Sequence, residues 1–165
     1  MNQTVQLPAV CEFMARHLGD VFDTMLSMKA SLVPHSDLPQ YEERVTGAVG
    51  FGGPTVTGAV YLHLSAPFAK VMATTMLGLA PEDLSGESEV NDVVGEATNM
   101  LAGGLKSWLC DCGYDCAVST PAIIRGASFV IEPTVEVERQ WLVFECGAER
   151  VAVEIHIKLD ELKQV

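Results

Sequence analysis

One stretch of 25 residues, 45–69, contains no Asp, Glu, Lys or Arg, and it restricts the folds open to this chain more than any other segment. An uncharged run of this length could span a membrane as a helix. This run, however, holds five glycines and two prolines, and its apolar residues alternate along the second half. Alternation is typical of a strand with two different faces, and Gly52-Gly53-Pro54 is typical of a turn. We therefore predict a hairpin of two strands, near 41–51 and 55–65, and no membrane span.

The other segments predict the order helix, strands, helix, helix, strands. Apolar residues at helical spacing predict long helices over about 8–30 and 89–109, with a short helix over 67–77 between them. Pro34 and Pro39 mark a loop, and Ser85 and Ser88 could cap the second long helix. The remaining strands are predicted at 118–124, 129–131, 135–146 and 151–159. This order indicates an α+β fold, because it lacks the regular βαβ alternation of a doubly wound sheet.

The two halves of the chain share a pattern. At an offset of 93, residues 50–65 lie over 143–158, and the coincidences include His63 over His156. The two long helices correspond at an offset of 76, which places Asp23 over Asn99. Two helix-plus-hairpin halves in the same order favour a pseudo-two-fold arrangement.

Composition narrows the classes of function. The chain has 165 residues, 22 acidic and 10 basic side chains, a net charge of −12, and 48% hydrophobic residues. This is the composition of a folded protein, and the length suggests one domain over residues 1–165. The acidic excess argues against nucleic acid as a partner, because phosphate binding needs clustered Lys and Arg. Five cysteines and no visible export segment lead us to expect a reducing, cytoplasmic location.

The second long helix carries a narrow polar strip. At about 100° per residue, four positions fall within an arc of roughly 60°; they are Asp92, Glu96, Asn99 and Gly103. No Lys or Arg occurs in the helix before Lys106, so the acids have no partner one turn away. Gly95 and other small residues flank the strip, although each glycine costs up to about 1 kcal/mol in a helix. The strip is either an ordinary solvated face or a docking face that lets another protein approach closely.

The pattern Asp92-x-x-x-Glu96-x-x-Asn99, followed by Pro121, resembles the signature of the CheC/CheX/FliY family of chemotaxis phosphatases. These proteins dephosphorylate response regulators of the CheY type. The segment Val118-Ser119-Thr120-Pro121 resembles the strand that follows the active helix in CheX-like members, and the likeness covers nearly the whole chain. Pro121 follows Asn99 after 21 residues, one fewer than the family spacing. The first helix lacks the Asn, since its equivalent positions are Arg16, Asp20, Asp23 and Ser27. The chain therefore resembles CheX, with one active helix, rather than CheC, with two.

The resemblance implies a CheC/CheX-like fold with two long helices packed on an antiparallel sheet. It also implies a phosphatase that inserts Glu96 and Asn99 into the active site of a phosphorylated CheY-type regulator. Asn99 would orient the attacking water, Glu96 would pair with the regulator's lysine, and Asp92 would support the helix. Gly95 and Gly103 would belong to the partner-binding face. The Mg²⁺ ion would belong to the regulator, so no metal or other cofactor is expected in this chain.

A homodimer formed through the sheets is also implied by the resemblance. The alternative function is a non-catalytic signalling or flagellar-switch adaptor of the same fold that binds a response regulator without hydrolysing anything.

Two further groups of residues could form sites. Cys110, Cys112 and Cys116 could bind zinc with a fourth ligand, but their spacing is not that of the usual Cys-x-x-Cys pair, which favours plain thiols. No cysteine has an arginine six residues later, so a cysteine-dependent phosphatase is not expected. His63 and His156 could form a metal site or proton relay, but positions inherited from the repeat explain them more simply. No glycine-rich phosphate loop is present.

Overall fold

The computed structural model of the protein describes residues 4–34 and 36–162. Its helices are α1 (Leu7–Leu26), α2 (Ala66–Leu77) and α3 (Glu87–Asp111), with a short 3-10 turn at Pro81–Asp83. Its strands are β1 (Ser31–Val33), β2 (Arg44–Gly52), β3 (Val56–Ser65), β4 (Ala117–Val118), β5 (Ala122–Gly126), β6 (Glu138–Cys146) and β7 (Glu149–Leu159). All pair antiparallel in one sheet of order β1-β6-β7-β3-β2-β4, with β5 also on β2. The expected α+β class is confirmed.

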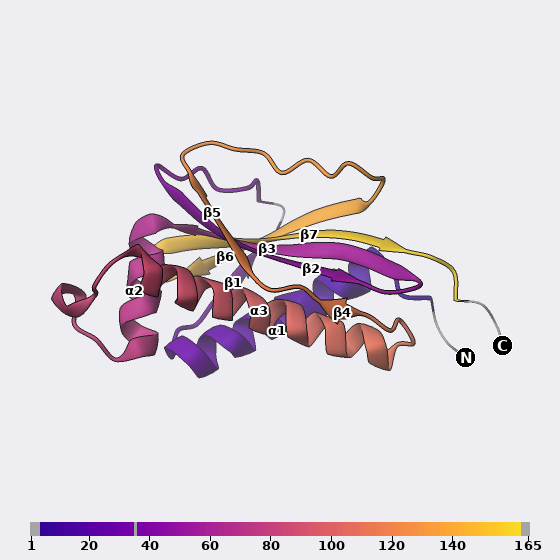
Figure 1. Ribbon diagram of the computed structural model, residues 1–165, viewed down its shortest axis with the longest axis horizontal. Helices are drawn as coiled ribbons and strands as arrows, with labels where there is room; N and C mark the ends of the chain where they lie inside the picture. Colours follow the sequence, from indigo (N-terminus) through magenta and orange to yellow (C-terminus); the bar gives the residue numbers. More distant parts are fainter. Residues whose placement is uncertain (1–3, 35, 163–165) are drawn as a thin grey trace.

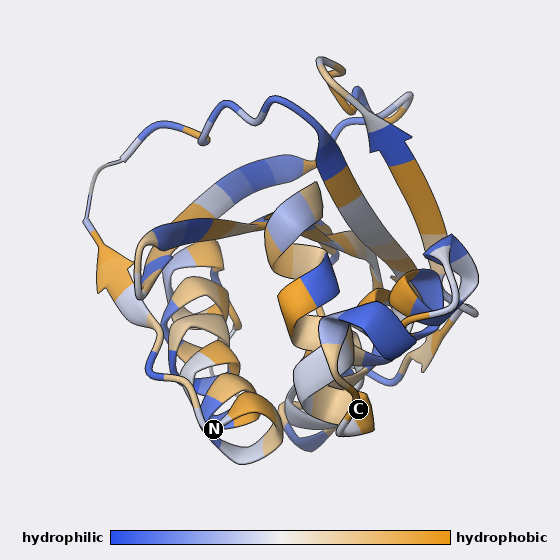
Figure 2. Ribbon diagram, turned by 90° about the vertical axis from the view of Figure 1, so that its left-hand side faces the viewer, coloured by the Kyte–Doolittle hydropathy of each residue, from blue (hydrophilic) through white to orange (hydrophobic). Residues whose placement is uncertain are grey.

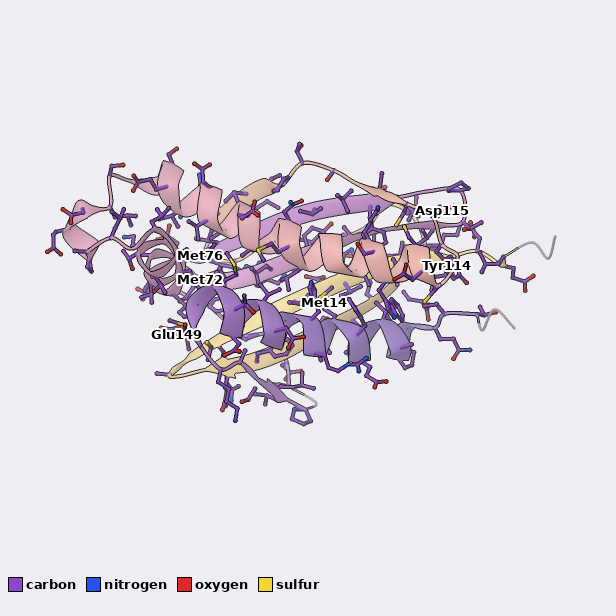
Figure 3. The ribbon with its side chains drawn as sticks, turned by 90° about the horizontal axis from the view of Figure 1, so that it is seen from below. Met14, Met72, Met76, Tyr114, Asp115 and Glu149 are labelled. Atoms are coloured by element: carbon purple, nitrogen blue, oxygen red, sulfur yellow. The ribbon has the colours of Figure 1, made fainter. Side chains whose placement is uncertain are left out.

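The sheet separates the helices from the long loops. Figure 1 shows α1 and α3 beneath the sheet, and the end-on view in Figure 2 shows the loops on its other side. Seen from below, the two long helices run side by side along the sheet, with the labelled Met14 on α1 and Met72 on the shorter α2 (Figure 3). Both methionines are fully buried. The apolar stripes of the helices therefore form one core with the face of the sheet that they cover.

Three local predictions near the helices are wrong. Helix α1 ends at Leu26 rather than near residue 30, because Ser27 takes a left-handed conformation (φ 50°) and its N–H closes the last turn. Strand β1 follows where only a loop was predicted. Helix α3 begins at Glu87, and neither Ser85 nor Ser88 caps it through a side chain. Instead, the Glu89 carboxylate reaches back and accepts the backbone N–H of Ser85 at 2.9 Å.

The segment after α3 differs from the prediction for a physical reason. The strand expected at 118–124 is split into β4 and β5, because Pro121 has no N–H to donate to the ladder. The Ser119 side chain accepts the N–H of Gly50 at 2.9 Å and so keeps the segment attached to β2. Residues 129–131 form no strand, and they belong to a loop over residues 127–137, called here the strap. Arginine side chains hold it down: Arg44 donates to the carbonyl of Phe129, and Arg139 to that of Ile131.

The sheet has the pseudo-two-fold arrangement suggested by the repeat. Adding 93 to each residue number converts the β2–β3 register into the β6–β7 register, so that Ala48 opposite Tyr61 becomes Trp141 opposite Glu154. The central strands β3 and β7 pair with Tyr61 opposite Glu154, two residues that are themselves equivalent. The pseudo-two-fold axis therefore passes between Tyr61 and Glu154.

A buried polar cluster lies on this axis. The two carboxylate oxygens of Glu154 accept hydrogen bonds from the histidines, one from His63 Nε2 at 2.9 Å and the other from His156 Nε2 at 2.8 Å, and Arg139 also donates to the second at 3.5 Å. Thr46 Oγ1 lies 2.8 Å from His63 Nδ1, so the neutral imidazole is satisfied on both sides. All four side chains are buried, on the face of the sheet that the strap covers. The two equivalent histidines thus have a structural role: both hydrogen-bond the buried Glu154. The sequence repeat did not indicate this role, because it does not point to Glu154 as their shared acceptor.

Acid is expected to weaken the fold in two steps. Burial lowers the pKa of His63 below its ordinary 6.5, although Glu154 opposes this shift. For Glu154, burial alone would raise the pKa, but the histidine hydrogen bonds outweigh it and hold the pKa at about 2, against 4.5 in a free chain. In both ranges the unfolded chain binds more protons, so stability falls first below about pH 6.5 and again from about pH 4.5 toward 2. One such proton changes the free energy of unfolding by about 1.4 kcal/mol per pH unit.

Urea unfolding at pH 7.5 and 5.5 measures the first step. His63→Gln is the comparison variant, because it keeps a hydrogen-bonding side chain but cannot titrate. The loss of stability between the two pH values should be smaller in His63→Gln than in the wild type. An equal loss in both proteins would contradict the assignment to His63.

Candidate functional site

The polar strip lies on the outer surface of α3. Asp92 and Glu96 are exposed, and Asn99 and Gly103 are partly exposed. The opposite side of the helix is buried in the core; its fully buried apolar side chains are Val94, Leu101, Ala102, Leu105 and Leu109. The structure thus brings the four strip positions together on one accessible face, as helical periodicity predicted.

Within the described residues, the acids of the strip form no ion pair. Across the residues that the structure describes, no basic side chain lies within 4.0 Å of the carboxylate of Asp92 or Glu96. Glu96 and Asn99 are three residues apart and therefore project from the same side of adjacent turns. A carboxylate and an amide are therefore presented together on one side of the helix.

The glycines of α3 have different surroundings. Gly95 is buried rather than part of an exposed face, and a Cβ built there would lie 3.5 Å from the ring of Pro121. A Cβ at Gly104 would strike the ring of His17, which hydrogen-bonds the Met100 carbonyl at 2.9 Å. Gly104 therefore permits the close approach of α1 and α3. Only Gly103 among these three opens to free space, since a Cβ there meets nothing within 4 Å.

Pro121 borders the strip from the neighbouring sheet edge. It is exposed, and it packs over Gly95, which immediately precedes Glu96 in the helix. Val118, on β4, is a large apolar side chain that is 36% exposed. Pro121 and Val118 therefore give the strip an apolar border on the side of β4.

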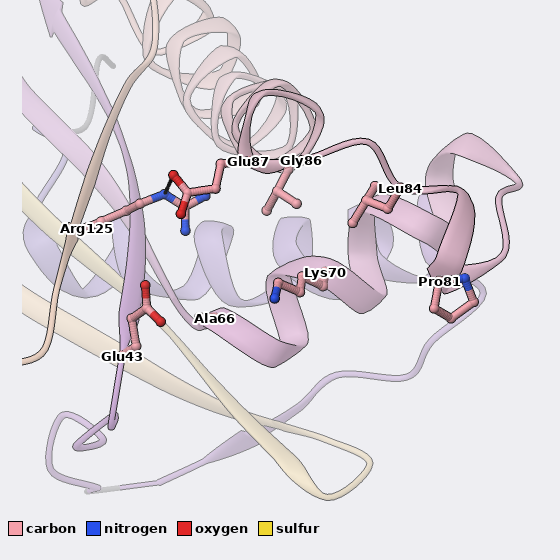
Figure 4. Close-up of a pocket in the computed structure, with 9 residues that line it drawn as sticks. Glu43, Ala66, Lys70, Pro81, Leu84, Gly86, Glu87 and Arg125 are labelled. Atoms are coloured by element: carbon pink, nitrogen blue, oxygen red, sulfur yellow. Dashed lines mark ion pairs between the residues drawn. The ribbon is translucent and has the colours of Figure 1, made fainter.

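Sequence reasoning missed the residue that fixes β5 against α3. Arg125 donates to Asn91 Oδ1 at 2.6 Å and lies 3.8 Å from the Glu87 carboxylate. Figure 4 shows this ion pair at the edge of a pocket of about 270 Å³, with Lys70 and Glu43 around it. The pocket lies at the start of α3, and none of the strip residues lines it. No spacing in the sequence connects Arg125 with Asn91, because the two are 34 residues apart.

The first helix carries the equivalent face without the amide. Arg16, Asp20 and Asp23 are exposed on α1 at the positions that correspond to Asp92, Glu96 and Asn99. The structure thus has two similar outward faces, and only the one on α3 combines Glu with Asn.

The three cysteines near the end of α3 are partly buried free thiols. Burial raises the pKa of Cys116 to about 11, with the neighbouring Cys110 adding to the shift. Over the described parts of the chain, no three or more His, Cys, Asp or Glu side chains gather in a way that could hold a metal ion.

Within residues 4–34 and 36–162, no helix is both long and apolar enough to cross a lipid bilayer.

Comparison with known proteins identifies the family. The family model described as chemotaxis phosphatase CheX matches residues 45–145. No curated protein matches the chain in sequence. Among solved structures, the chain is similar to the chemotaxis protein CheX from Vibrio vulnificus, with 26% identity over 90% of this chain and 96% of that one and a TM-score of 0.76.

Two further solved structures agree. A CheC-like superfamily protein from Shewanella sp. PV-4 has 25% identity, covers 93% of this chain and 99% of its own, and gives a TM-score of 0.76. A CheX–CheY–BeF₃–Mg²⁺ complex from Borrelia burgdorferi shares the fold, with 18% identity, coverage of 90% and 97%, and a TM-score of 0.74. The family model spans more than half of the chain, and the solved structures share its fold over about nine tenths of its length. The chain belongs to the CheX family of chemotaxis phosphatases.

Proposed function

We propose that this protein accelerates hydrolysis of the aspartyl phosphate of a CheY-type response regulator. The observation that carries the proposal is the pair Glu96 and Asn99, which are presented on one open helix face, with no ion-pair partner for Glu96 among the described residues. Membership of the CheX family supports the reaction, and the CheX–CheY complex from Borrelia burgdorferi supports this class of partner.

Asn99 orients the attacking water in this proposal. Phosphoryl transfer depends mainly on positioning and charge stabilisation, so one well-placed group can accelerate it. The amide carbonyl accepts a hydrogen bond from the water, its NH₂ can donate elsewhere, and the group does not titrate. The water forms the new bond to phosphorus, the bond to the aspartate oxygen breaks, and inorganic phosphate leaves.

Glu96 holds the helix in register on the regulator. Its carboxylate pairs with the lysine of the regulator's phosphorylation site, one turn before Asn99. An exposed ion pair contributes little, but a pair that becomes desolvated in a close interface can contribute several kcal/mol. Asp92 supports this end of the strip without touching the reacting atoms. The Mg²⁺ ion belongs to the regulator, this chain supplies no cofactor, and the active form is a cytoplasmic homodimer.

The test is the decay of a phosphorylated CheY-type regulator with and without this protein. Faster decay that depends on the concentration of this protein supports the phosphatase. Binding of the regulator without faster decay, repeated with several regulators from the same genome, would overturn the phosphatase and favour a non-catalytic adaptor.

Gly103→Ala is expected to separate stability from docking. A Cβ at this position meets nothing within 4 Å, so the exchange should stabilise the helix by about 0.5–1 kcal/mol. The same methyl group should raise the regulator concentration needed for half-maximal rate, because it stands on the docking face. Denaturant unfolding and initial rates at varied regulator concentration measure the two effects.

Gly19→Ala is the matched control, since a Cβ at this position of α1 also meets nothing within 4 Å. It should gain stability without changing the rate. If Gly103→Ala also leaves the half-maximal concentration unchanged, Gly103 does not belong to the docking face.

A further inference from the structure

We propose that a pocket around Arg44, on the face of the sheet opposite the helices, binds a small organic carboxylate. The pocket has a volume of about 480 Å³ and lies between residues 38–41 and the beginning of the strap, residues 127–130. It is separate from the polar strip, which lies on α3 on the other side of the sheet.

Arg44 is a buried cation with no counter-charge in contact with it among the described residues. The residue begins β2 and is only 5% exposed. Among the residues that the structure describes, no carboxylate lies within 4.0 Å of its guanidinium. Within the same residues its Nε has no hydrogen-bond partner. A guanidinium keeps its charge even when buried, so an unpaired one is energetically costly.

The groups around Arg44 only partly compensate for this charge. Its Nη2 donates to the carbonyl of Phe129, and the Phe129 ring lies 3.6 Å from the guanidinium carbon. Burial lowers the pKa of Arg44, and the field of Glu154 only opposes that shift. The oxygens of Glu154 are already held by His63 and His156, and Arg139 lies 3.5 Å from one of them. The local environment therefore favours one additional negative charge.

The lining of the pocket points to a carboxylate with an apolar body. Leu38, Pro39, Phe129 and Val130 supply apolar surface, while Gln40 and Ser128 supply polar side chains. A carboxylate accepts a hydrogen bond from a guanidinium N–H and neutralises its single charge. A phosphate dianion would bring a second negative charge into surroundings that cannot stabilise it.

Benzoate is a suitable probe, because it joins one carboxylate to one flat apolar ring. In an NMR titration of the ¹⁵N-labelled protein at constant ionic strength, the Arg44 Nε–H signal and the amides of residues 127–130 should shift with saturation. A ligand of this size is expected to bind with a Kd on the order of 1 mM. Benzamide, which has the same shape without the charge, should give at least tenfold weaker shifts.

Two variants keep the test decisive. Arg44→Gln removes the charge, and Ala127→Phe fills the pocket from an exposed position while Arg44 stays in place. Both should abolish the saturable shifts, whereas Ala9→Phe, at an exposed position on α1, should retain them. If Arg44→Gln does not fold, the test rests on the other two variants: benzoate should cause saturable shifts in Ala9→Phe and none in Ala127→Phe.

Several results would overturn the proposal. These are the absence of saturable shifts with benzoate, equal binding of benzamide, equal binding of inorganic phosphate, or binding that survives in Ala127→Phe.

Discussion

Asn99→Ala is expected to reduce the stimulated dephosphorylation of a CheY-type regulator by roughly tens- to hundreds-fold, the scale of losing one oriented polar group. The side chain lies partly exposed on the outer surface of α3, so its loss should not disturb the core. Stability should therefore stay within about 0.5 kcal/mol of the wild type. The measurement is the rate of loss of the regulator's phosphoryl group at saturating concentrations of each protein.

Asp23→Ala is the matched control for this experiment. Asp23 occupies the equivalent position on α1 and is also exposed, but the first helix lacks the amide. Its exchange should leave the rate unchanged. Full activity in Asn99→Ala would show that another group orients the water, and equal losses in both variants would show that both helices contribute.

Glu154→Leu is expected to destabilise the fold by about 3–5 kcal/mol, the usual cost of removing one partner from a buried charged network. The exchange leaves the Nε2–H groups of His63 and His156 without an acceptor, and it leaves Arg139 facing them. Glu154→Gln should lose less, since it keeps one carbonyl oxygen at the same place. Urea unfolding at pH 7.5 measures both variants.

Glu145→Leu provides the comparison on the neighbouring strand. Its carboxylate forms a solvent-exposed ion pair with Arg150 at 3.1 Å, and such pairs contribute about 0–1 kcal/mol. Similar unfolding free energies for Glu145→Leu and Glu154→Leu would show that the buried polar cluster around Glu154 contributes no more to stability than an exposed ion pair.

Local patterns in the sequence predicted the parts of the fold that local patterns control. The long helices and the outward position of Asp92, Glu96 and Asn99 follow from a 3.6-residue period. The repeat at an offset of 93 predicted the pseudo-two-fold arrangement, and the registers of the two hairpins are equivalent at that offset. The family assignment rested on the pattern Asp92-x-x-x-Glu96-x-x-Asn99 followed by Pro121, and the comparisons confirm the family.

The parts that were missed depend on side chains that meet from distant positions. The Glu154 cluster joins residues 91 apart, and the strap is held by a bond between residues 85 apart. Residues 151–157 alternate like an exposed strand, yet all of them are buried, because the strap side of the sheet is also covered. Gly95 was placed on the open face, although the packing of Pro121 buries it.

The pairing of β3 with β7 also affects how this chain must fold. Val56 pairs with Leu159 and His63 with Ala152, separations of 103 and 89 residues. The β2–β3 and β6–β7 hairpins can form early from local contacts. The pairing of β3 with β7 forms later, because the long segment of chain between these strands must first be brought together. Each half of the chain also supplies edge strands to the other half. Strand β1, from the first half, pairs with β6 of the second, and β4 and β5, from the second half, pair with β2 of the first. Neither half can complete its own sheet, so we expect the chain to acquire its stability in one late, cooperative step.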